Sequence, residues 1–466
     1  MRMPRTPLQG SKLENSTIVQ LSQLAGFRAY VLAILLTIPL VVVFILNPSV
    51  IYISDGWWIS SIINTINQKA IENPWFAGEP LTYPYFTLFL VSFLAKLIGT
   101  WGAIILSALI INFLAVLAVF QLAKEITKSE YESALGTFMF FTFSSFLSGI
   151  VLIFDILTKN TAFPEFLKTV HGPSYYLSMK FLPIEGFALP NTFMMSLEPN
   201  LQTVALAIIL LGVLRNNNLL TAFSLGILVG CNPILGITAV IIVSLLMLSK
   251  FGIEAILPLI GIGIVVLIID SVYLYGILQS GATGGMLATS PIGVLAFIVF
   301  LFAFLPLFYF LKINDLSFFI IALSSMLVLS FTKIGYLYAT IPLFMFICIN
   351  SAKGLARADL LKVLIPFFIL SLFPLFLTVG AYSVYKPDIN WDAVAYIQNH
   401  PEIQGQTVWE CYPKNETRWL HVYSTTFGTS KVYIADKQTA LAYGMSEEKY
   451  NERLRIYEEV CGKVMR

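Results

Sequence analysis

Long apolar runs separated by short polar segments fill most of the chain, and this pattern ends near residue 386. A helix needs roughly 20 apolar residues to cross the hydrocarbon core of a bilayer, and several runs approach that length. The runs that we interpret as spans are 29–47, 101–123, 133–154, 200–214, 219–231, 234–249, 253–273, 291–311, 315–331, 335–350 and 361–384. The pattern therefore predicts a polytopic α-helical membrane protein with about 11 transmembrane helices.

Two of these runs, 219–231 and 234–249, are short for straight spans and meet at Cys231-Asn232-Pro233. This pair predicts a shallow helical hairpin inside the membrane. Asp270 is close to the outer end of run 253–273, where we expect its side chain just to reach water. Cys231 and Cys348 lie within apolar runs and are interpreted as packing residues.

Lysine and arginine set the predicted orientation, because short cytoplasmic loops carry an excess of both. With the N-terminus inside, the inner loops hold about twice as many basic residues as the outer segments of the membrane region. Residues 84–98 are apolar enough to be a further span. Counting them as one would reverse the orientation of the following segments and place Lys124, Lys128, Arg215 and Lys250 on the outer side. We therefore predict that 84–98 forms a helix that dips into the outer leaflet, with Lys96 reaching the interface.

This layout predicts a cytoplasmic segment at 1–28, a transmembrane domain at 29–385 and an outer C-terminal domain at 386–466. Two long outer loops cover 48–100 and 155–199. In the tail, short strands are predicted at 408–412, 419–423 and 431–434. A terminal amphipathic helix follows, with its apolar face formed by Tyr450, Leu454, Tyr457 and Cys461. The tail is thus expected to be a small α+β domain.

Composition agrees with a lipid environment. Of the 466 residues, 57% are hydrophobic and 12% charged, whereas soluble domains have about 25% charged residues. The net charge of +2 argues against a nucleic-acid partner, because no basic stripe is present to neutralise phosphates. Cys411 and Cys461 could form a disulfide outside the cell or remain two free thiols. Asn415 begins a glycosylation sequon in the tail, while the sequon at Asn15 is on the predicted inner side and should stay unmodified.

Asp55 opens the first outer loop, next to Trp57 and Trp58. A carboxylate in a partly dry site can act as a general base, because desolvation raises its pKa. Alternatively, Asp55 caps a helix at 56–70 and the two tryptophans mark the membrane interface. Further along, Tyr83 and Tyr85 belong to a proline-rich and aromatic segment, 73–86. It is suited to hold a sugar ring or an isoprenoid, or else it forms an interfacial belt around a tight turn.

The second outer loop contains His171 and ends at Glu198, at the mouth of a span. An acid there should face a cavity, a cation or a partner, although Glu198 followed by Pro199 also fits a helix start. Asp55 and Glu198 could together hold a divalent cation such as Mg²⁺ or Mn²⁺. His171 is more readily explained as a surface residue, because no two histidines stand at metal-ligand spacing. Lys333, near Tyr336, could bind the phosphate of a lipid-linked donor or of an ordinary phospholipid.

The order of these features resembles the GT-C glycosyltransferases. The shared features are an inner N-terminus, an acid that opens the first outer loop, a membrane-dipping helix and an outer C-terminal domain. In those enzymes, which use polyprenyl-phosphate-linked sugars, an acid of the first loop acts near the acceptor, and here only Asp55 matches it. The run Lys333-Ile-Gly-Tyr336-Leu-Tyr-Ala-Thr-Ile-Pro342 resembles the segment that lies near the lipid phosphate.

A closer resemblance is to an uncharacterised archaeal and bacterial membrane family with a triple-tyrosine motif. It rests on Pro74-Trp-Phe-Ala-Gly-Glu-Pro-Leu-Thr-Tyr83-Pro-Tyr85-Phe86 and on the tail segment Thr439-Ala-Leu-Ala-Tyr-Gly444. This chain places Pro84 between the two tyrosines. It also lacks the histidines that follow the second-loop acid in that family, where it has Glu198-Pro-Asn-Leu-Gln202 instead.

The resemblance implies a membrane glycosyltransferase that moves a sugar from a polyprenyl (dolichyl) phosphate to a protein or glycan acceptor on the outer face. The site residues would be Asp55 as base and, around the substrates, Trp57, Trp58, Tyr83, Tyr85, His171, Glu198, Lys333 and Tyr336. In an archaeal or other prokaryotic cell the protein would reside in the plasma membrane. A transporter or flippase of lipid-linked saccharides and a non-catalytic scaffold with an outer binding domain are the alternatives.

Overall fold

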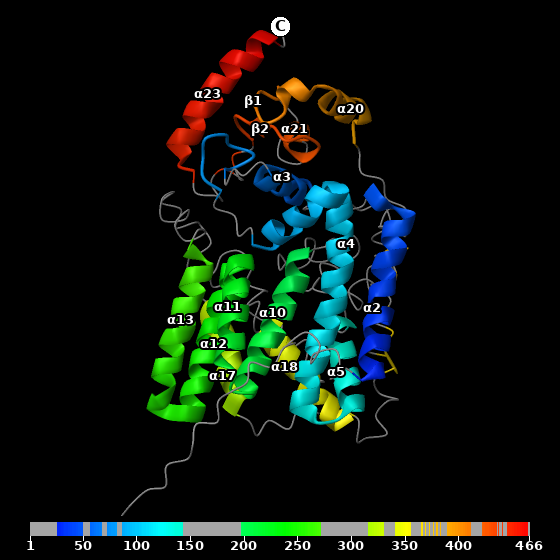
Figure 1. Cartoon of the computed structure of the whole chain (residues 1–466), viewed down its shortest axis with the longest axis vertical. Coiled ribbons are helices and arrows are strands. Elements are labelled where there is room, and N and C mark those ends of the chain that lie inside the picture. Colours follow the sequence, from blue (N-terminus) through cyan, green and yellow to red (C-terminus); the bar gives the residue numbers. More distant parts are fainter. Residues whose placement is uncertain are drawn as a thin grey trace, which may run out of the picture.

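The computed structural model describes residues 26–49, 56–67, 72–81, 86–142, 197–271, 316–329, 341–355, isolated positions between 365 and 383, and most of 389–464. The described part is mostly helical. A bundle of apolar helices carries a smaller domain at one end (Figure 1). The bundle contains α2 (Phe27–Leu46), α4 (Phe86–Thr127), α5 (Glu130–Thr142), α10 (Leu197–Leu214), α11 (Asn218–Cys231), α12 (Pro233–Phe251), η3 (Gly252–Ala255), α13 (Ile256–Ile269), α17 (Leu316–Leu329) and α18 (Ile341–Leu355).

Three helical segments of the described residues are long and apolar enough to cross a membrane: Phe27–Leu46, Phe86–Thr127 and the run Pro233–Ile269, which α12, η3 and α13 form together. Large apolar side chains on their outer faces are exposed, among them Leu35, Leu257 and Ile268. A soluble protein rarely exposes such extended apolar surface. The fold is therefore that of a helical membrane protein, and the helices agree in position with the runs predicted between 29 and 350. Run 291–311 lies outside the described residues.

α4 is broken at Gly99, where φ is 77° and ψ is 159°. The piece before this residue packs through Thr87, Leu88 and Val91, while Phe93 and Leu97 are exposed. Figure 1 shows that the helix turns sharply beside α3 and then descends through the bundle. Its full 42 residues would make a straight helix of about 63 Å, twice the thickness of a bilayer core. The predicted division between 84–98 and 101–123 is thus present as a break at Gly99.

Charged side chains link the loop between α4 and α5 to the loop between α10 and α11. These helix ends lie at the end of the bundle opposite the C-terminal domain (Figure 1). Arg215 pairs with Glu125 at 2.8 Å, and Lys128 also contacts this glutamate. Lys124 pairs with Glu130 at 2.9 Å. Lys250 donates to Asn216 at 2.6 Å, next to Arg215. The basic residues that the orientation argument assigned to one side therefore do lie at one end of the bundle.

The smaller domain contains α3 (Gly56–Asn67), α20 (Trp391–Asn399), η5 (Pro401–Ile403), β1 (Thr407–Val408), α21 (Tyr423–Thr426), β2 (Lys431–Val432) and α23 (Glu447–Val464). The two strands pair in parallel, Thr407 opposite Lys431 and Val408 opposite Val432. They are shorter than the sequence predicts. Tyr423, the last residue of the predicted strand 419–423, instead begins α21, because its backbone and that of Ser424 turn inward to bind Glu410.

The terminal helix α23 confirms the predicted amphipathic pattern. Tyr450, Tyr457 and Cys461 are buried and Leu454 is half-buried. They pack against a core formed jointly by the tail and by loop one, the segment between α2 and α4, with members such as Ile62, Val432 and Ala440. Loop one and the tail therefore share one hydrophobic core and fold as a unit, the C-terminal domain together with α3 and the turn 72–81.

The turn 72–81 belongs to this core. Trp75 and Phe76 are 2% and 1% exposed, so these two side chains do not contribute to an open aromatic platform, which was one of the two alternatives for segment 73–86. The backbone of the turn continues the small sheet, because the Ala77 amide donates to the carbonyl of Val432 at 2.9 Å. In return, the Val432 amide donates to the Pro74 carbonyl at 2.9 Å.

Candidate functional site

Most residues that the sequence singled out lie outside the described residues. This group comprises Asp55, Tyr83, Tyr85, His171, Lys333, Tyr336 and Asn415. Trp58 is the third residue of α3, and Glu198 is the second residue of α10. Asp55 directly precedes α3, whose start at Gly56 agrees with the predicted helix 56–70.

Trp57 is a core residue. Its side chain is 4% exposed and packs edge-on against Tyr423 and Phe427, with ring centroids 5.4 Å away in each case. The indole therefore joins α3 to α21. This position corrects the expectation that Trp57 contacts a substrate, because its side chain is buried among aromatic neighbours.

A groove of about 460 Å³ lies where the C-terminal domain meets the apex of α4. Its wall toward the bundle includes Asn64, Thr100 and Trp101, and the opposite wall, from the C-terminal domain, includes Trp391, Gln398 and Gln404. We call it the junction groove. Trp101 and Trp391 are 38% and 54% exposed. Aromatic faces combined with amide groups can bind a polar ring compound such as a sugar, through stacking and hydrogen bonds.

Asn64 fixes the shape of the groove. Its amide nitrogen donates to the carbonyls of Thr426 at 3.0 Å and Gly428 at 2.9 Å. Its amide oxygen accepts from Thr100 at 2.5 Å. One buried side chain thus connects α3, the turn after α21 and the break in α4. Such a buried polar network holds its members in a single arrangement when every group is paired.

Gln404 holds the wall from the C-terminal domain in place in the same way, through its own hydrogen bonds. Its amide nitrogen donates to the Ile397 carbonyl at 2.9 Å, and its oxygen accepts both the backbone amide and the hydroxyl of Thr429 at 2.7 Å. The groups of the wall that remain for a ligand are the ring of Trp391 and the exposed amide of Gln398. The groove is therefore held open by satisfied amides and presents an aromatic face.

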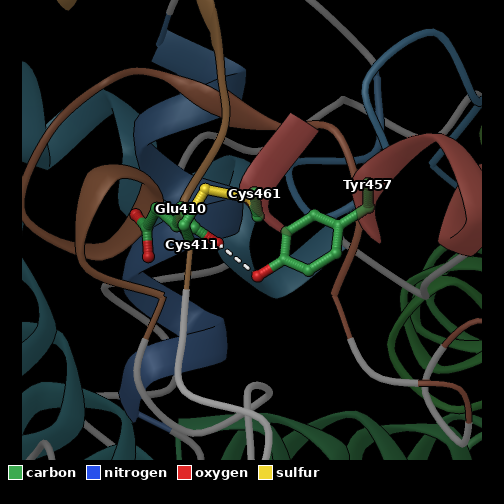
Figure 2. The surroundings of a disulfide bond; sticks show 4 residues. All are labelled: Glu410, Cys411, Tyr457 and Cys461. Carbon is green, nitrogen blue, oxygen red and sulfur yellow. Dashed lines mark hydrogen bonds between the residues drawn. A yellow bond between two sulfur atoms is a disulfide. The ribbon is translucent and has the colours of Figure 1, made fainter. Parts of the chain in front are cut away.

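A disulfide and the buried carboxylate of Glu410 lie next to each other in the C-terminal domain. Cys411 is bonded to Cys461, with 5.4 Å between their Cα atoms, which is the pairing that the sequence left open against two free thiols. Figure 2 shows the Tyr457 hydroxyl donating to the carbonyl of Glu410, at 3.0 Å. The disulfide closes a separation of 50 residues, and loss of a native disulfide in a small domain costs about 2–5 kcal/mol.

The carboxylate of Glu410 accepts three hydrogen bonds at the start of α21. The backbone amides of Tyr423 and Ser424 donate at 3.2 and 2.5 Å, and the Ser424 hydroxyl donates as well. Burial nevertheless raises the pKa of Glu410 to about 7, because desolvation outweighs these hydrogen bonds. The segment α21 that Glu410 binds leads directly into Phe427 and Gly428 of the groove wall.

The sequence did not single out the groove residues. The groove joins segments that are far apart in the sequence, and none of the predicted elements pointed to Trp101 or Trp391. The one available signal was compositional, an asparagine before a tryptophan at Asn390-Trp391 and glutamines at 398 and 404. No protein-family model matches the chain, and no curated protein matches it.

Proposed function

We propose that this protein is a membrane glycosyltransferase of the GT-C type. It would move a sugar from a polyprenyl (dolichyl) phosphate to an acceptor on the outer face. The junction groove is the observation that carries this proposal. It combines a polar, tryptophan-lined wall with a position directly above the apolar helices. A lipid-linked sugar needs both environments at once, because its prenyl chain stays in lipid while its sugar stays in water.

The topology that goes with this proposal is multi-pass, with a cytoplasmic N-terminus and the C-terminal domain outside. The charged end of the bundle would then face the cytoplasm, as the bias of basic residues favours. The Cys411–Cys461 bond supports the same orientation, because disulfides persist mainly in oxidising compartments.

In the proposed reaction, the acceptor oxygen attacks the anomeric carbon of the sugar while the bond from that carbon to the phosphate oxygen breaks. Asp55 takes the proton of the acceptor, and polyprenyl phosphate leaves with the bonding electrons. Positive charge stabilises that leaving group, and Lys333 or a cation held near Glu198 would provide it. Asp55 directly precedes α3, whose residue Asn64 lines the groove.

The direct test is transfer of label from a polyprenyl-phosphate sugar by the purified protein in detergent or liposomes. Losing a general base lowers a rate by about 10²–10⁴-fold, so Asp55→Asn should be slower by that factor. The matched control is Glu254→Gln, an exposed acid at the charged end of the bundle. Equal rates for wild type and Asp55→Asn would remove Asp55 from the chemistry.

A second pair of variants tests the groove. Trp391→Ala should raise the KM for the saccharide about tenfold, because it removes an aromatic face from the groove wall. Tyr396→Ala is its control, since Tyr396 is an exposed aromatic on the same helix that stacks on His400 instead of lining the groove. An identical KM in both variants would place the saccharide elsewhere.

A transporter or flippase of lipid-linked saccharides is the second candidate. It is favoured by the polar side chains at the break between α11 and α12, since transporters bind substrates near broken helices. In sealed vesicles, a flippase would move a labelled lipid-linked saccharide between leaflets without forming a glycosylated product. Movement without transfer would therefore favour this alternative.

A further inference from the structure

Five polar side chains lie around the break between α11 and α12, inside the helical bundle. They are Thr87, Gln202, Cys231, Asn232 and Asp270, and we call them the break cluster. Thr87 is fully buried, Gln202 is 1% exposed and Asp270 is 2% exposed. The sequence suggested that Asp270 would reach water, but its side chain is buried and lies against Gly230 of α11. The carboxylate is therefore a buried group.

The break cluster lies at the far end of two apolar helices from the charged end of the bundle. α11 has 14 residues and α12 has 19, which are rises of about 21 and 28 Å, against a hydrocarbon core about 30 Å thick. The first piece of α4 reaches down from Gly99 to the same level, because the Thr87 hydroxyl donates to Cys231 Sγ at 3.1 Å. Burying a polar group among apolar helices costs free energy unless the group is paired.

The neutral members of the cluster are hydrogen-bonded. Asn232 caps α12 by accepting from the Leu235 amide at 3.0 Å, and its own amide nitrogen is 3.5 Å from Gln202 Oε1. Thr87 uses its only proton on Cys231, so the lone pairs of its oxygen remain for another partner.

Asp270 differs from the others. Among the described residues, its Oδ2 atom has no hydrogen-bond partner and no lysine or arginine pairs with it. Its Oδ1 atom lies against the main chain of Gly230, where an added Cβ would be 2.7 Å from that oxygen. Glycine at 230 therefore makes the room that the carboxylate occupies. A buried, unpaired carboxylate needs a positive charge or a proton.

Helix ends of both signs meet around the break cluster. α11 ends at Cys231 and α13 at Ile269, where the C-terminal ends carry partial negative charge, whereas α4 and α12 begin at Phe86 and Pro233 with partial positive charge. Pro233 has no N–H to offer the Val229 carbonyl, four residues before it, so the break also frees a main-chain oxygen. Helix ends and unwound carbonyls of this kind coordinate small cations in membrane proteins.

We propose that the break cluster binds one monovalent metal cation, with the Asp270 carboxylate as its charged ligand. Neutral oxygens of Gln202, Thr87 and the end of α11 complete the site. One carboxylate balances one positive charge, whereas Mg²⁺ and Ca²⁺ sites usually recruit more acids. The described residues contain no group of three His, Cys, Asp or Glu side chains suited to a transition metal.

The proposed cation would couple two parts of the molecule. It would tie the ends of α11 and α13 to the start of α4, since Phe86 and Asp270 both contact Gly230. The other end of this α4 piece is Gly99, in the wall of the junction groove. This inference goes beyond the proposed glycosyl transfer and does not depend on it.

The first test measures the thermal midpoint of the purified full-length protein in detergent at constant pH and ionic strength. Replacing choline chloride with saturating sodium chloride should raise the midpoint of the wild type by about 2–4 °C. Asp270→Asn should abolish the shift. Asp392→Asn, an exposed aspartate of the C-terminal domain, should keep it.

The second test measures binding of radiolabelled sodium, for which we expect one ion per chain. Gly230→Ala keeps the charge but displaces the carboxylate, and should weaken binding at least about tenfold. Gly263→Ala is the control, because a Cβ there meets nothing within 4 Å. Thr87→Val, which removes one oxygen, should weaken binding severalfold and provides a measurement if Gly230→Ala does not fold.

Four outcomes would overturn the proposal. They are an equal midpoint in sodium and choline, a sodium shift that persists in Asp270→Asn, stabilisation that follows pH but not sodium, and a requirement for Mg²⁺ or Ca²⁺. The third would mean that Asp270 carries a proton instead of a metal ion.

Discussion

Glu410 is the residue through which pH should act on the C-terminal domain. Its pKa is about 7 in the folded protein, against an ordinary value of 4.5, so folding favours the protonated carboxyl. Its contribution to stability is therefore complete below about pH 4.5 and is lost as the pH rises through about 7. The loss should be on the order of 1–3 kcal/mol.

Thermal unfolding between pH 5 and pH 8.5 checks this prediction. The wild type should lose more stability over this range than Glu410→Gln, whose amide does not titrate. Glu458→Gln, an exposed glutamate on α23, should behave as the wild type. Parallel pH profiles for wild type and Glu410→Gln would contradict the assignment.

The role of an individual aromatic or acidic residue is the feature that local sequence predicts least well. Trp57 and Trp75 both looked suited to a membrane interface or a sugar, yet both are buried. An aromatic side chain has the same chemistry in a core and in a binding site, so only its neighbours distinguish the two. Glu410 gave no signal, because its pKa depends on burial beneath a segment 13 and 14 residues later.

At the scale of elements, the break in α4 depends on Gly99. Its φ of 77° and ψ of 159° lie in a region that is essentially restricted to glycine. Gly99→Ala should therefore destabilise the protein by about 1–3 kcal/mol, even though a Cβ there meets nothing within 4 Å. Gly261→Ala, at a position in α13 with equal space, should be neutral or stabilising. Denaturation of both variants in detergent makes the comparison, and equal midpoints would mean that the break is not strained.

The attachment of α23 to the turn 72–81 depends on Arg453. Its guanidinium donates to the carbonyls of Tyr433 at 2.7 Å and Ala77 at 2.9 Å, and to Glu79 at 2.8 Å. Arg453→Gln should destabilise the domain by about 2–3 kcal/mol, since three bonds to a charged donor are lost. Arg455→Gln is the matched control, because Arg455 is exposed on the same helix.

Limited proteolysis of the C-terminal domain, followed together with its thermal midpoint, tests this attachment. Faster cleavage in Arg453→Gln than in Arg455→Gln is the expected result. Equal cleavage rates would show that the hydrophobic core alone holds α23 in place.

At the scale of the whole molecule, the proposed topology places the two ends of the bundle on opposite sides of the membrane. Cys231 and Cys348 are buried and Cys411 is bonded to Cys461, so an introduced cysteine should be labelled over a low background. In intact cells, a membrane-impermeant maleimide should label Asn399→Cys, and Asn218→Cys only after permeabilisation. Both asparagines are exposed. The reverse pattern would invert the topology.

The sequence alone determined the features that depend on local pattern. Apolar runs placed the helices of the bundle, because lipid leaves a spanning segment little choice but a helix. The break at Asn232-Pro233 and the apolar face of α23 were readable for the same reason, since proline chemistry and helical periodicity act over a few residues. The bias of basic residues also predicted correctly that Lys124, Arg215 and Lys250 gather at one end.

Only the tertiary structure decided which distant residues meet. Residues 56–81 fold with the tail, Asn64 joins the turn after α21 to the break in α4, and Asp270 is buried beside Gly230. Such encounters depend on how packed elements lie in three dimensions, and no period or spacing along one chain encodes them. Cys411 and Cys461 illustrate the division. The sequence could name both cysteines, whereas the packing of α23 brought their Cα atoms to 5.4 Å and made the bond possible.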